Sequence, residues 1–393
     1  MRTAVLLLVF FSMNSLLGVA QQRGNIMPAS QPQQSELRDA LSDRPLPRPP
    51  RTPSMIQSPV LGFVYAADIS ELRTILGIPG ASRLSGPLAL PSGVINVIFA
   101  PGQQCALAEQ ANGAPISVIA FPAANPVALV EIPNAIAHPD IVAFSPSGGN
   151  AAVYSVSEQR LQIITGLLST PRVARDIASG ALPDDAQLLA IADDGITLLE
   201  GTVSNDVYIL VEASGPQFIH SAEDLGGMAF TPGSHDLLVF DPNSGTLSLL
   251  QNVVSRPQLP PRLPGPDAVG FRAGAKDTPV LDGNGDPGTP VSPPTVTPVS
   301  ITIASGLTGF TGNVFLQADS HVATITSTAA NDLAEVDLQN RLVQHLRLPA
   351  NAAALQPLRT PGKYLLSYQA GQPALILDTS GTQASLYFIP AAR

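Results

Sequence analysis

The side chains best suited to acid–base or metal chemistry are the five histidines and the acids near them. His138 stands close to Asp140 in the chain, and His220 stands close to Asp224. A His–Asp pair can act as a general base or ligate a metal, although in a turn it more often bonds the backbone. We predict ligand binding at these four residues and assign no catalytic residue.

A second candidate site is the run from Asp282 through Asn284 to Asp286. Oxygen ligands at the first, third and fifth positions match the start of a calcium loop. The match ends at Pro293, which stands where such a loop carries a bidentate glutamate. We therefore expect a glycine-rich turn and no cofactor, with calcium bound at these three residues as the alternative.

Other catalytic patterns are missing from the sequence. It contains no G-x-S-x-G nucleophile elbow, no H-E-x-x-H zinc pattern and no phosphate-binding G-x-x-x-x-G-K-[ST] loop. Cys105 is the only cysteine, which excludes a disulfide framework and a cysteine-based metal centre. Its Ala-Leu-Ala surroundings indicate a buried hydrophobic residue, with a reactive thiol as the alternative.

The elements that would position these residues follow from a repeat. From about residue 58 onwards, one phrase recurs: two or three apolar residues, a bulky anchor, then a turn such as Ser145-Pro146-Ser147-Gly148. The anchors recur about every 43 residues, and each turn is followed by another apolar run. The anchors are Phe99, Phe144, Ile191, Phe230, Phe271, Phe315 and Leu358.

Each repeat has room for four short strands, and the chain lacks long segments with helical periodicity free of Gly and Pro. Four strands in about 43 residues are typical of a β-propeller blade, whose apolar faces are covered by the neighbouring blades. The sequence therefore predicts an all-β propeller over 58–393. The seven anchors favour seven blades, and the length also allows eight.

The repeated phrase resembles the Ser-Pro-Asp-Gly turn of YVTN-type and WD-type propeller repeats, and of exported bacterial propeller proteins. The resemblance covers about 58–393 and implies the fold, not an activity. Because the chain has no Trp, it lacks the WD dipeptide and the Trp-containing motifs of quinone-binding propellers and sialidases.

Ring closure depends on the first strands of the repeat region. Residues 62–77 match the second and third strands of a later repeat, 152–166, but lack an inner strand of their own. Ser385–Ile389 is a candidate to complete that blade. The proline-rich stretch at 255–298 should give a weak or partly looped blade, because proline cannot donate to a sheet.

The N-terminus predicts export. Residues 1–20 combine Arg2, an apolar run and a Gly18-Val19-Ala20 cleavage site, which are typical of a signal peptide. Residues 21–57 are rich in Pro and Gln, and we expect a disordered linker there. The mature chain should then contain no membrane span and be secreted or periplasmic.

Composition limits the partners. The net charge of −10 argues against nucleic-acid binding, which needs a basic surface. We expect a monomer that acts as a binding or scaffold module in the bacterial envelope, with an unknown protein or envelope ligand as partner. The alternative is a propeller hydrolase or lactonase with a metal or a His/Asp cluster at the channel mouth, and whether the protein is an enzyme stays open.

Overall fold

The computed structural model describes residues 58–391, with gaps. The predicted signal peptide, the linker and most of the proline-rich stretch lie outside the described residues, as do Asp282, Asn284 and Asp286. No helix in the described part of the chain has the length and apolar character needed to cross a membrane. The gaps are 123–124, 179–181, 183, 212–214, 254–297, 311–313, 317–320, 328–330, 349–354 and 382–383.

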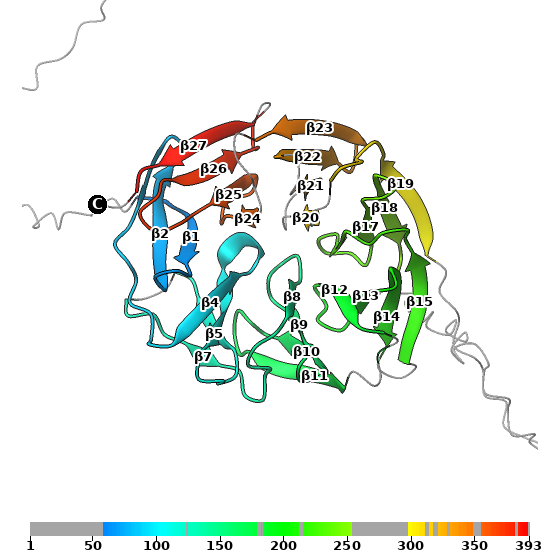
Figure 1. Ribbon diagram of the computed structural model, residues 1–393, viewed down its shortest axis with the longest axis horizontal. Helices are drawn as coiled ribbons and strands as arrows, with labels where there is room; N and C mark the ends of the chain where they lie inside the picture. The colour runs from blue at the N-terminus through cyan, green and yellow to red at the C-terminus, as the bar shows by residue number, and fades with distance from the viewer. Residues whose placement is uncertain are drawn as a thin grey trace, which may run out of the picture. The chain divides into compact units, whose positions relative to one another are not determined.

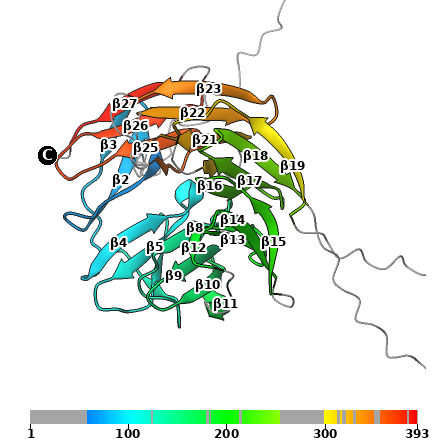
Figure 2. The ribbon, with the colours of Figure 1, turned by 45° about the vertical axis from the view of Figure 1, so that its right-hand side comes forward.

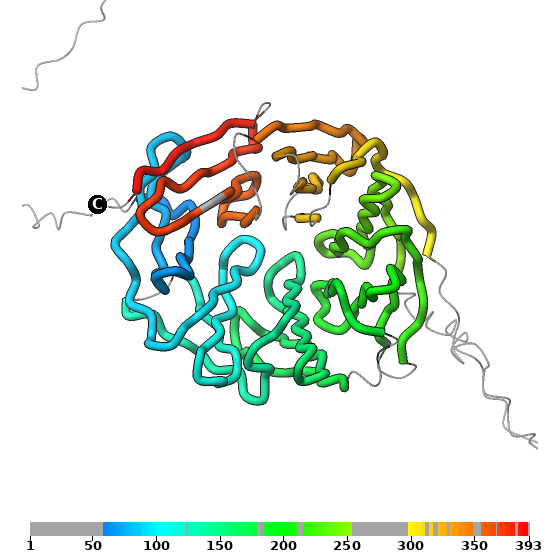
Figure 3. The backbone as a smooth tube through the Cα atoms, viewed as in Figure 1, coloured from blue at the N-terminus to red at the C-terminus, as the bar shows by residue number. Residues whose placement is uncertain are grey.

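Seven antiparallel sheets follow one another around a central axis, which confirms the predicted β-propeller with seven blades rather than eight (Figure 1). We number the sheets blade 1 to blade 7 in chain order. Within each of blades 2 to 7, four strands run from the axis outward, and each strand pairs with the next along the chain. Blade 1 has three strands in the described residues. Figure 3 traces the same ring as a tube.

The first four blades contain fifteen of the described strands. The strands are β1 (Val60–Ala66), β2 (Glu71–Ile78) and β3 (Ala81–Leu84) in blade 1; β4 (Val94–Phe99), β5 (Cys105–Gln110), β6 (Ser117–Ala120) and β7 (Val130–Glu131) in blade 2; β8 (Ile141–Phe144), β9 (Ala151–Ser155), β10 (Arg160–Thr165) and β11 (Arg172–Ala178) in blade 3; and β12 (Ala186–Ile191), β13 (Leu198–Thr202), β14 (Asp206–Val211) and β15 (Gly215–Ser221) in blade 4.

The last three blades have four strands each. The strands are β16 (Gly227–Phe230), β17 (Leu237–Asp241), β18 (Thr246–Gln251) and β19 (Val299–Ala304) in blade 5; β20 (Val314–Leu316), β21 (Val322–Thr326), β22 (Asp332–Asp337) and β23 (Leu342–Arg347) in blade 6; and β24 (Gln356–Pro357), β25 (Lys363–Ser367), β26 (Ala374–Asp378) and β27 (Ser385–Ile389) in blade 7. A short 3-10 turn, η1 (Pro101–Gln103), joins β4 to β5.

Burial along the strands explains the low share of charged residues. The second strands β9 and β13 are buried at every residue, because both of their faces pack against neighbouring blades. The outer strand β11 alternates exposed and half-buried residues. Core clusters extend across blade boundaries, and one joins blades 5 and 6 from Leu238 to Val336. Figure 2 shows the blades side by side in a tilted view.

The repeated turn lies between the first and second strands of a blade. In blade 3 it joins β8 to β9, and Gly148 has a φ of 72°, a conformation that favours glycine. The Gly148 amide donates to the Ser145 carbonyl, which closes the turn. The phrase therefore marks the end of the inner strand in blades 2 to 7, as the repeat indicated, and blade 1 has no copy of it.

Phe271 is the one anchor of the repeat that falls outside the described residues. The strands β18 and β19 flank 254–297 and pair with each other within blade 5. The range around Phe271 lies outside the described residues, between the third and fourth strands of one blade. The described strands supply six complete blades and blade 1, which confirms the count of seven, and the inner strand expected at Phe271 falls outside the described part of the chain. The segment 254–297 is about one repeat long, so it preserved the apparent period.

The prediction that Ser385–Ile389 completes the first blade is wrong. This segment is β27, the outer strand of blade 7, where it pairs with β26. Blade 1 is instead left without a fourth strand in the described residues, and β1 is its inner edge. The free edge is closed by side chains from the two neighbouring blades rather than by a strand.

Gln103 of η1 makes most of this closure. Its Oε1 accepts from the Phe63 amide at 2.7 Å, and its Nε2 donates to the Phe63 carbonyl at 3.1 Å. Gln356 of β24 also donates to the Phe63 carbonyl, at 3.2 Å. At Gly62 a Cβ would lie 2.6 Å from the Gln103 Oε1, so glycine is needed for this close approach. One amide side chain thus makes the two bonds that a neighbouring strand would make.

Candidate functional site

The first predicted pair is divided between two separate contacts. His138, in the loop before β8, places its Nδ1 3.6 Å from the Oε2 of Glu109 on β5 of blade 2. Asp140 accepts a hydrogen bond from the Val156 amide at 2.7 Å, in the turn after β9. His138 is therefore close to a glutamate of another blade, and Asp140 stabilises a turn.

The second predicted pair lies near blades 4 and 5. His220 is on the outer strand β15, and burial lowers the pKa of its imidazole while Asp241 raises it. Asp224 is exposed in the connection to β16. In the described part of the chain, no hydrogen bond or ion pair joins any two of the four predicted residues, and no three His, Cys, Asp or Glu residues group as metal ligands. Ligand binding at these residues stays a prediction.

Cys105 is a buried residue of β5. Its side chain is 0% exposed, and its Sγ lies 3.6 Å from the Gly148 carbonyl of blade 3. Burial raises the pKa of the thiol to about 11, which keeps it protonated at neutral pH. These facts agree with the structural interpretation of this cysteine.

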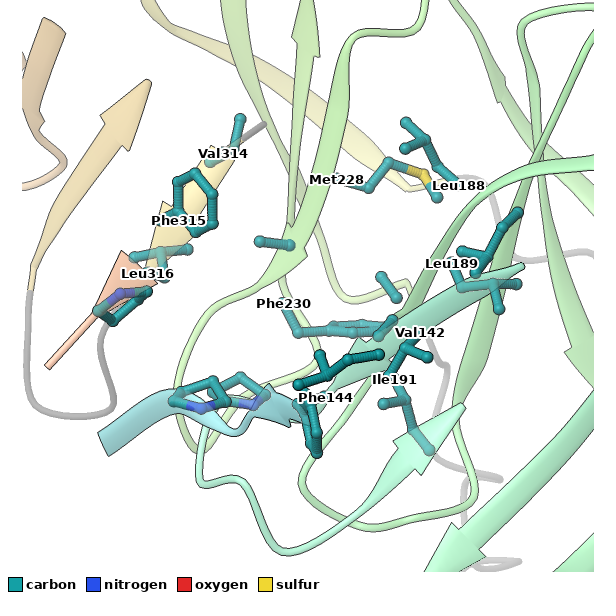
Figure 4. A pocket seen from close by; sticks show the side chains of 18 of the residues that line it. Val142, Phe144, Leu188, Leu189, Ile191, Met228, Phe230, Val314, Phe315 and Leu316 are labelled. Atoms are coloured by element: carbon teal, nitrogen blue, oxygen red, sulfur yellow. The ribbon is translucent and has the colours of Figure 1, made fainter. Parts of the chain in front are cut away.

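The sequence reasoning missed the apolar channel at the axis of the ring. It has a volume of about 340 Å³ and is lined by apolar side chains from the inner strands of blades 2 to 7 (Figure 4). Blade 1 contributes no lining residue. The lining residues are Ile98, Phe99, Pro101, Ile141, Val142, Ala143, Phe144, Pro146, Leu188, Leu189, Ala190, Ile191, Met228, Ala229, Phe230, Val314, Phe315, Leu316 and Pro357.

The lining of the channel differs from the linings expected for a metal-dependent enzyme and for an inert scaffold. A metal-dependent enzyme would bring acids and histidines together there, and an inert scaffold would pack small residues. This channel instead presents large side chains, among them Phe144, Phe230 and Phe315. Those three residues are anchors of the repeated phrase, so the signal was in the sequence: the bulky residue occurs on the strand nearest the axis.

Next to the channel, the turns of three blades are joined by one aspartate. Asp193, in the turn after β12, accepts from the Ser147 amide of blade 3 at 2.8 Å and from the Gly233 amide of blade 5 at 3.2 Å. The next residue, Asp194, lies 2.9 Å from the His235 Nε2. Burial alone would raise the pKa of Asp194, but hydrogen bonds from Thr197, Ile196 and His235 lower it to about 2. These residues connect blades, and they frame one end of the inner strands.

No family model and no curated protein matches the chain. Several solved structures do. A functionally unknown protein from Desulfotomaculum acetoxidans matches with 12% identity and a TM-score of 0.49, over 84% of this chain and 99% of that one. Virginiamycin B lyase from Staphylococcus aureus matches with 10% identity and a TM-score of 0.41, over 81% and 91%. Hsv2 from Kluyveromyces lactis matches with 10% identity and a TM-score of 0.44, over 73% and 74%. Likenesses this remote do not carry an activity from one protein to another.

Proposed function

We propose that the protein is an exported binding propeller of the bacterial envelope, and that its central channel holds a small nonpolar molecule. The observation that carries the proposal is the channel lining, which is made of apolar side chains from six blades. A volume of about 340 Å³ is within the range of small-molecule pockets. Moving a nonpolar ligand from water into such a channel is favoured by about 25 cal/mol for each Å² of apolar surface buried.

The export part of the proposal rests on the sequence of residues 1–20, with its positive start, apolar run and small-residue cleavage site. An envelope protein meets lipids and other nonpolar molecules, so the proposed location agrees with the proposed ligand class. The binding interpretation also fits the channel better than a hydrolase or lactonase does. Those enzymes need titratable groups or a metal beside the bound substrate, and none of the channel-lining residues is titratable.

Titration with the neutral fluorophore 1-N-phenylnaphthylamine tests the proposal. We expect its fluorescence to rise and saturate as it enters the channel. Val142→Asp places a carboxylate among the lining residues and should weaken binding at least tenfold, because the charge must be desolvated or the ligand excluded. Val142→Thr keeps the shape of the side chain and should weaken binding severalfold. If the aspartate variant does not fold, this variant tests whether the fluorophore binds in the channel.

The matched control is Val130→Asp. Val130 lies on β7 and is 49% exposed, away from the channel-lining residues. The control should bind the fluorophore as the parent does. Absence of saturable binding, or equal binding by Val142→Thr, Val142→Asp and the parent, would overturn the proposal.

A further inference from the structure

The wall of the channel carries polar atoms although its side chains are apolar. Every residue that lines it is Ile, Leu, Val, Ala, Met, Phe or Pro, so the polar atoms that it presents belong to the backbone. The first strand of each of blades 2 to 7 is an edge strand, with a hydrogen-bonded neighbour on its outer side alone. An edge strand leaves a row of backbone N–H and carbonyl groups outside the sheet. On these strands, that row faces the axis of the ring (Figure 1).

The register of the strands identifies the groups that face the axis. In blade 3, the Ser145 amide donates to the Asn150 carbonyl at 2.9 Å. The next pair along the same ladder joins Phe144 to Ala151. Hydrogen-bonded and non-bonded pairs alternate along an antiparallel ladder. The N–H and the carbonyl of Phe144 therefore point away from β9 and toward the axis.

The same register recurs in three other blades, where the residue after the anchor donates to the residue before the second strand or to its first residue. The bonds run from Ala100 to Cys105 at 3.0 Å in blade 2, from Ala192 to Thr197 at 3.0 Å in blade 4, and from Thr231 to Asp236 at 2.9 Å in blade 5. The anchors Phe99, Ile191 and Phe230 therefore also direct their N–H and carbonyl groups to the axis. Blade 7 has Pro357 at the corresponding position, which agrees with this register, because proline occurs where a ladder needs no N–H.

The axis-facing groups of these four anchors lack partners in the protein. Among the described residues, no hydrogen bond reaches the axis-facing amides and carbonyls of Phe99, Phe144, Ile191 and Phe230. A wholly apolar ligand that fills the channel would separate these groups from water without giving them partners, which opposes binding. A ligand of the proposed class therefore binds best when part of it forms hydrogen bonds with the backbone.

We infer that the channel selects a nonpolar molecule that carries a neutral amide group. This inference rests on the proposed function and narrows its ligand class. A strand edge offers both donors and acceptors, and an amide has a carbonyl that accepts and an N–H that donates. A trans amide directs these two groups to opposite sides, so it can accept from an anchor amide of one blade and donate to an anchor carbonyl of another. A charged group is unsuitable, because no lining side chain carries a charge to pair with it.

Displacement of bound 1-N-phenylnaphthylamine from the full chain by three molecules of similar shape tests the inference. Benzanilide joins two phenyl rings through an amide, phenyl benzoate through an ester that accepts but does not donate, and trans-stilbene through a carbon–carbon double bond. The hydrophobic effect alone favours stilbene, the least polar of the three. We expect instead that benzanilide displaces the fluorophore at a concentration at least tenfold lower than phenyl benzoate and also lower than stilbene. A site that hydrogen-bonds its ligand rejects an analogue that lacks the bonding group.

The result separates this inference from the proposed function. If the fluorophore shows no saturable binding, the proposed function is wrong and the inference is wrong with it. If the fluorophore binds but stilbene displaces it best, or the three compounds displace it equally, the channel binds nonpolar molecules without selecting an amide. That outcome overturns the inference alone.

Two variants locate the amide in the channel. Val142→Asp should weaken the binding of benzanilide at least tenfold, because it adds a charge among the lining residues. Val130→Asp, at an exposed position of β7 outside the lining, is the matched control and should bind benzanilide as the parent does. Equal affinity in the two variants would place benzanilide outside the channel and overturn the inference. The comparison of the three compounds uses the parent protein, so it tests the inference even if Val142→Asp does not fold.

Discussion

Gln103 and Glu200 occupy similar surroundings at two junctions of the ring, and they differ in what their polar atoms contact. Both side chains are 0% exposed. At the junction of blades 1 and 2, the Gln103 amide bonds both the amide and the carbonyl of Phe63. On β13 of blade 4, Glu200 has no hydrogen-bond partner for either carboxyl oxygen among the described residues.

The difference shows how burial acts on a polar side chain. A buried side-chain amide at a strand edge gives hydrogen-bond partners to one backbone N–H and one backbone carbonyl, and its own oxygen and nitrogen gain partners as well. It therefore stabilises the ring. A buried carboxyl without a partner is stable only in its neutral form. Burial, together with the charges of Asp184 and Asp185, raises the pKa of Glu200 to about 8. The contribution of Gln103 to the stability of the ring should therefore be the same at every pH, whereas the contribution of Glu200 should change with pH.

The largest effect is expected for Gln103→Ala. The change leaves the Phe63 amide buried without its partner and opens a cavity beside β1, which together should lower the free energy of unfolding by about 3 to 5 kcal/mol. Urea denaturation measures the loss. Gln104→Ala is the matched control, since the neighbouring Gln104 side chain is exposed and its removal should cost less than about 0.5 kcal/mol. Equal losses for the two variants would show that Gln103 does not close blade 1.

Glu200→Gln should have the next largest effect, and its size should depend on pH. The ordinary pKa of the carboxyl is 4.5 and its folded value is about 8, so between these values the folded chain holds a proton that the unfolded chain has lost. The parent should therefore lose stability as the pH rises from 4.5 to 8 and level off above 8. Glutamine removes this loss.

The measurement is urea denaturation of parent and variant at pH 5, 7 and 9. The difference in unfolding free energy between Glu200→Gln and the parent should increase in favour of the variant by on the order of 3 kcal/mol from pH 5 to pH 9. Glu131→Gln makes the same chemical change at an exposed position and should give a difference independent of pH. A flat difference for Glu200→Gln would mean that the carboxyl is ionised in the folded protein.

The sequence was sufficient for the fold because the propeller repeats its strongest signal. A bulky anchor before a turn recurs in each complete blade, and apolar burial at the ring axis selects it. The sequence could not show that β18 and β19, the strands that flank 254–297, pair within one blade, because a stretch of one period leaves the spacing of the repeat unchanged. Nor could it identify Gln103, because the partner of that amide is the backbone of Phe63, a group that every residue carries.

The candidate sites were harder to predict for a related reason. His138 and Asp140 are close in the chain, but a turn and a neighbouring blade give each a separate contact. Glu335 on β22 of blade 6 contacts Thr379, which follows β26 of blade 7, and no local pattern connects these two residues. Contacts between blades follow the spacing of the ring, whereas short motifs report contacts within one turn.

The smallest loss of stability is expected for the Asp193 variant. Like Gln103, its side chain bonds backbone amides of other blades, Ser147 and Gly233, but it is only half-buried. Water can replace its oxygens when they are removed, so Asp193→Ala should lower the unfolding free energy by about 1 kcal/mol, well below the loss at Gln103. Asp68→Ala, at an exposed position, is the control and should change stability by less than about 0.5 kcal/mol. If Asp193→Ala cost as much as Gln103→Ala in the same urea denaturation, the number of bonds between blades rather than their burial would determine the stability of the ring.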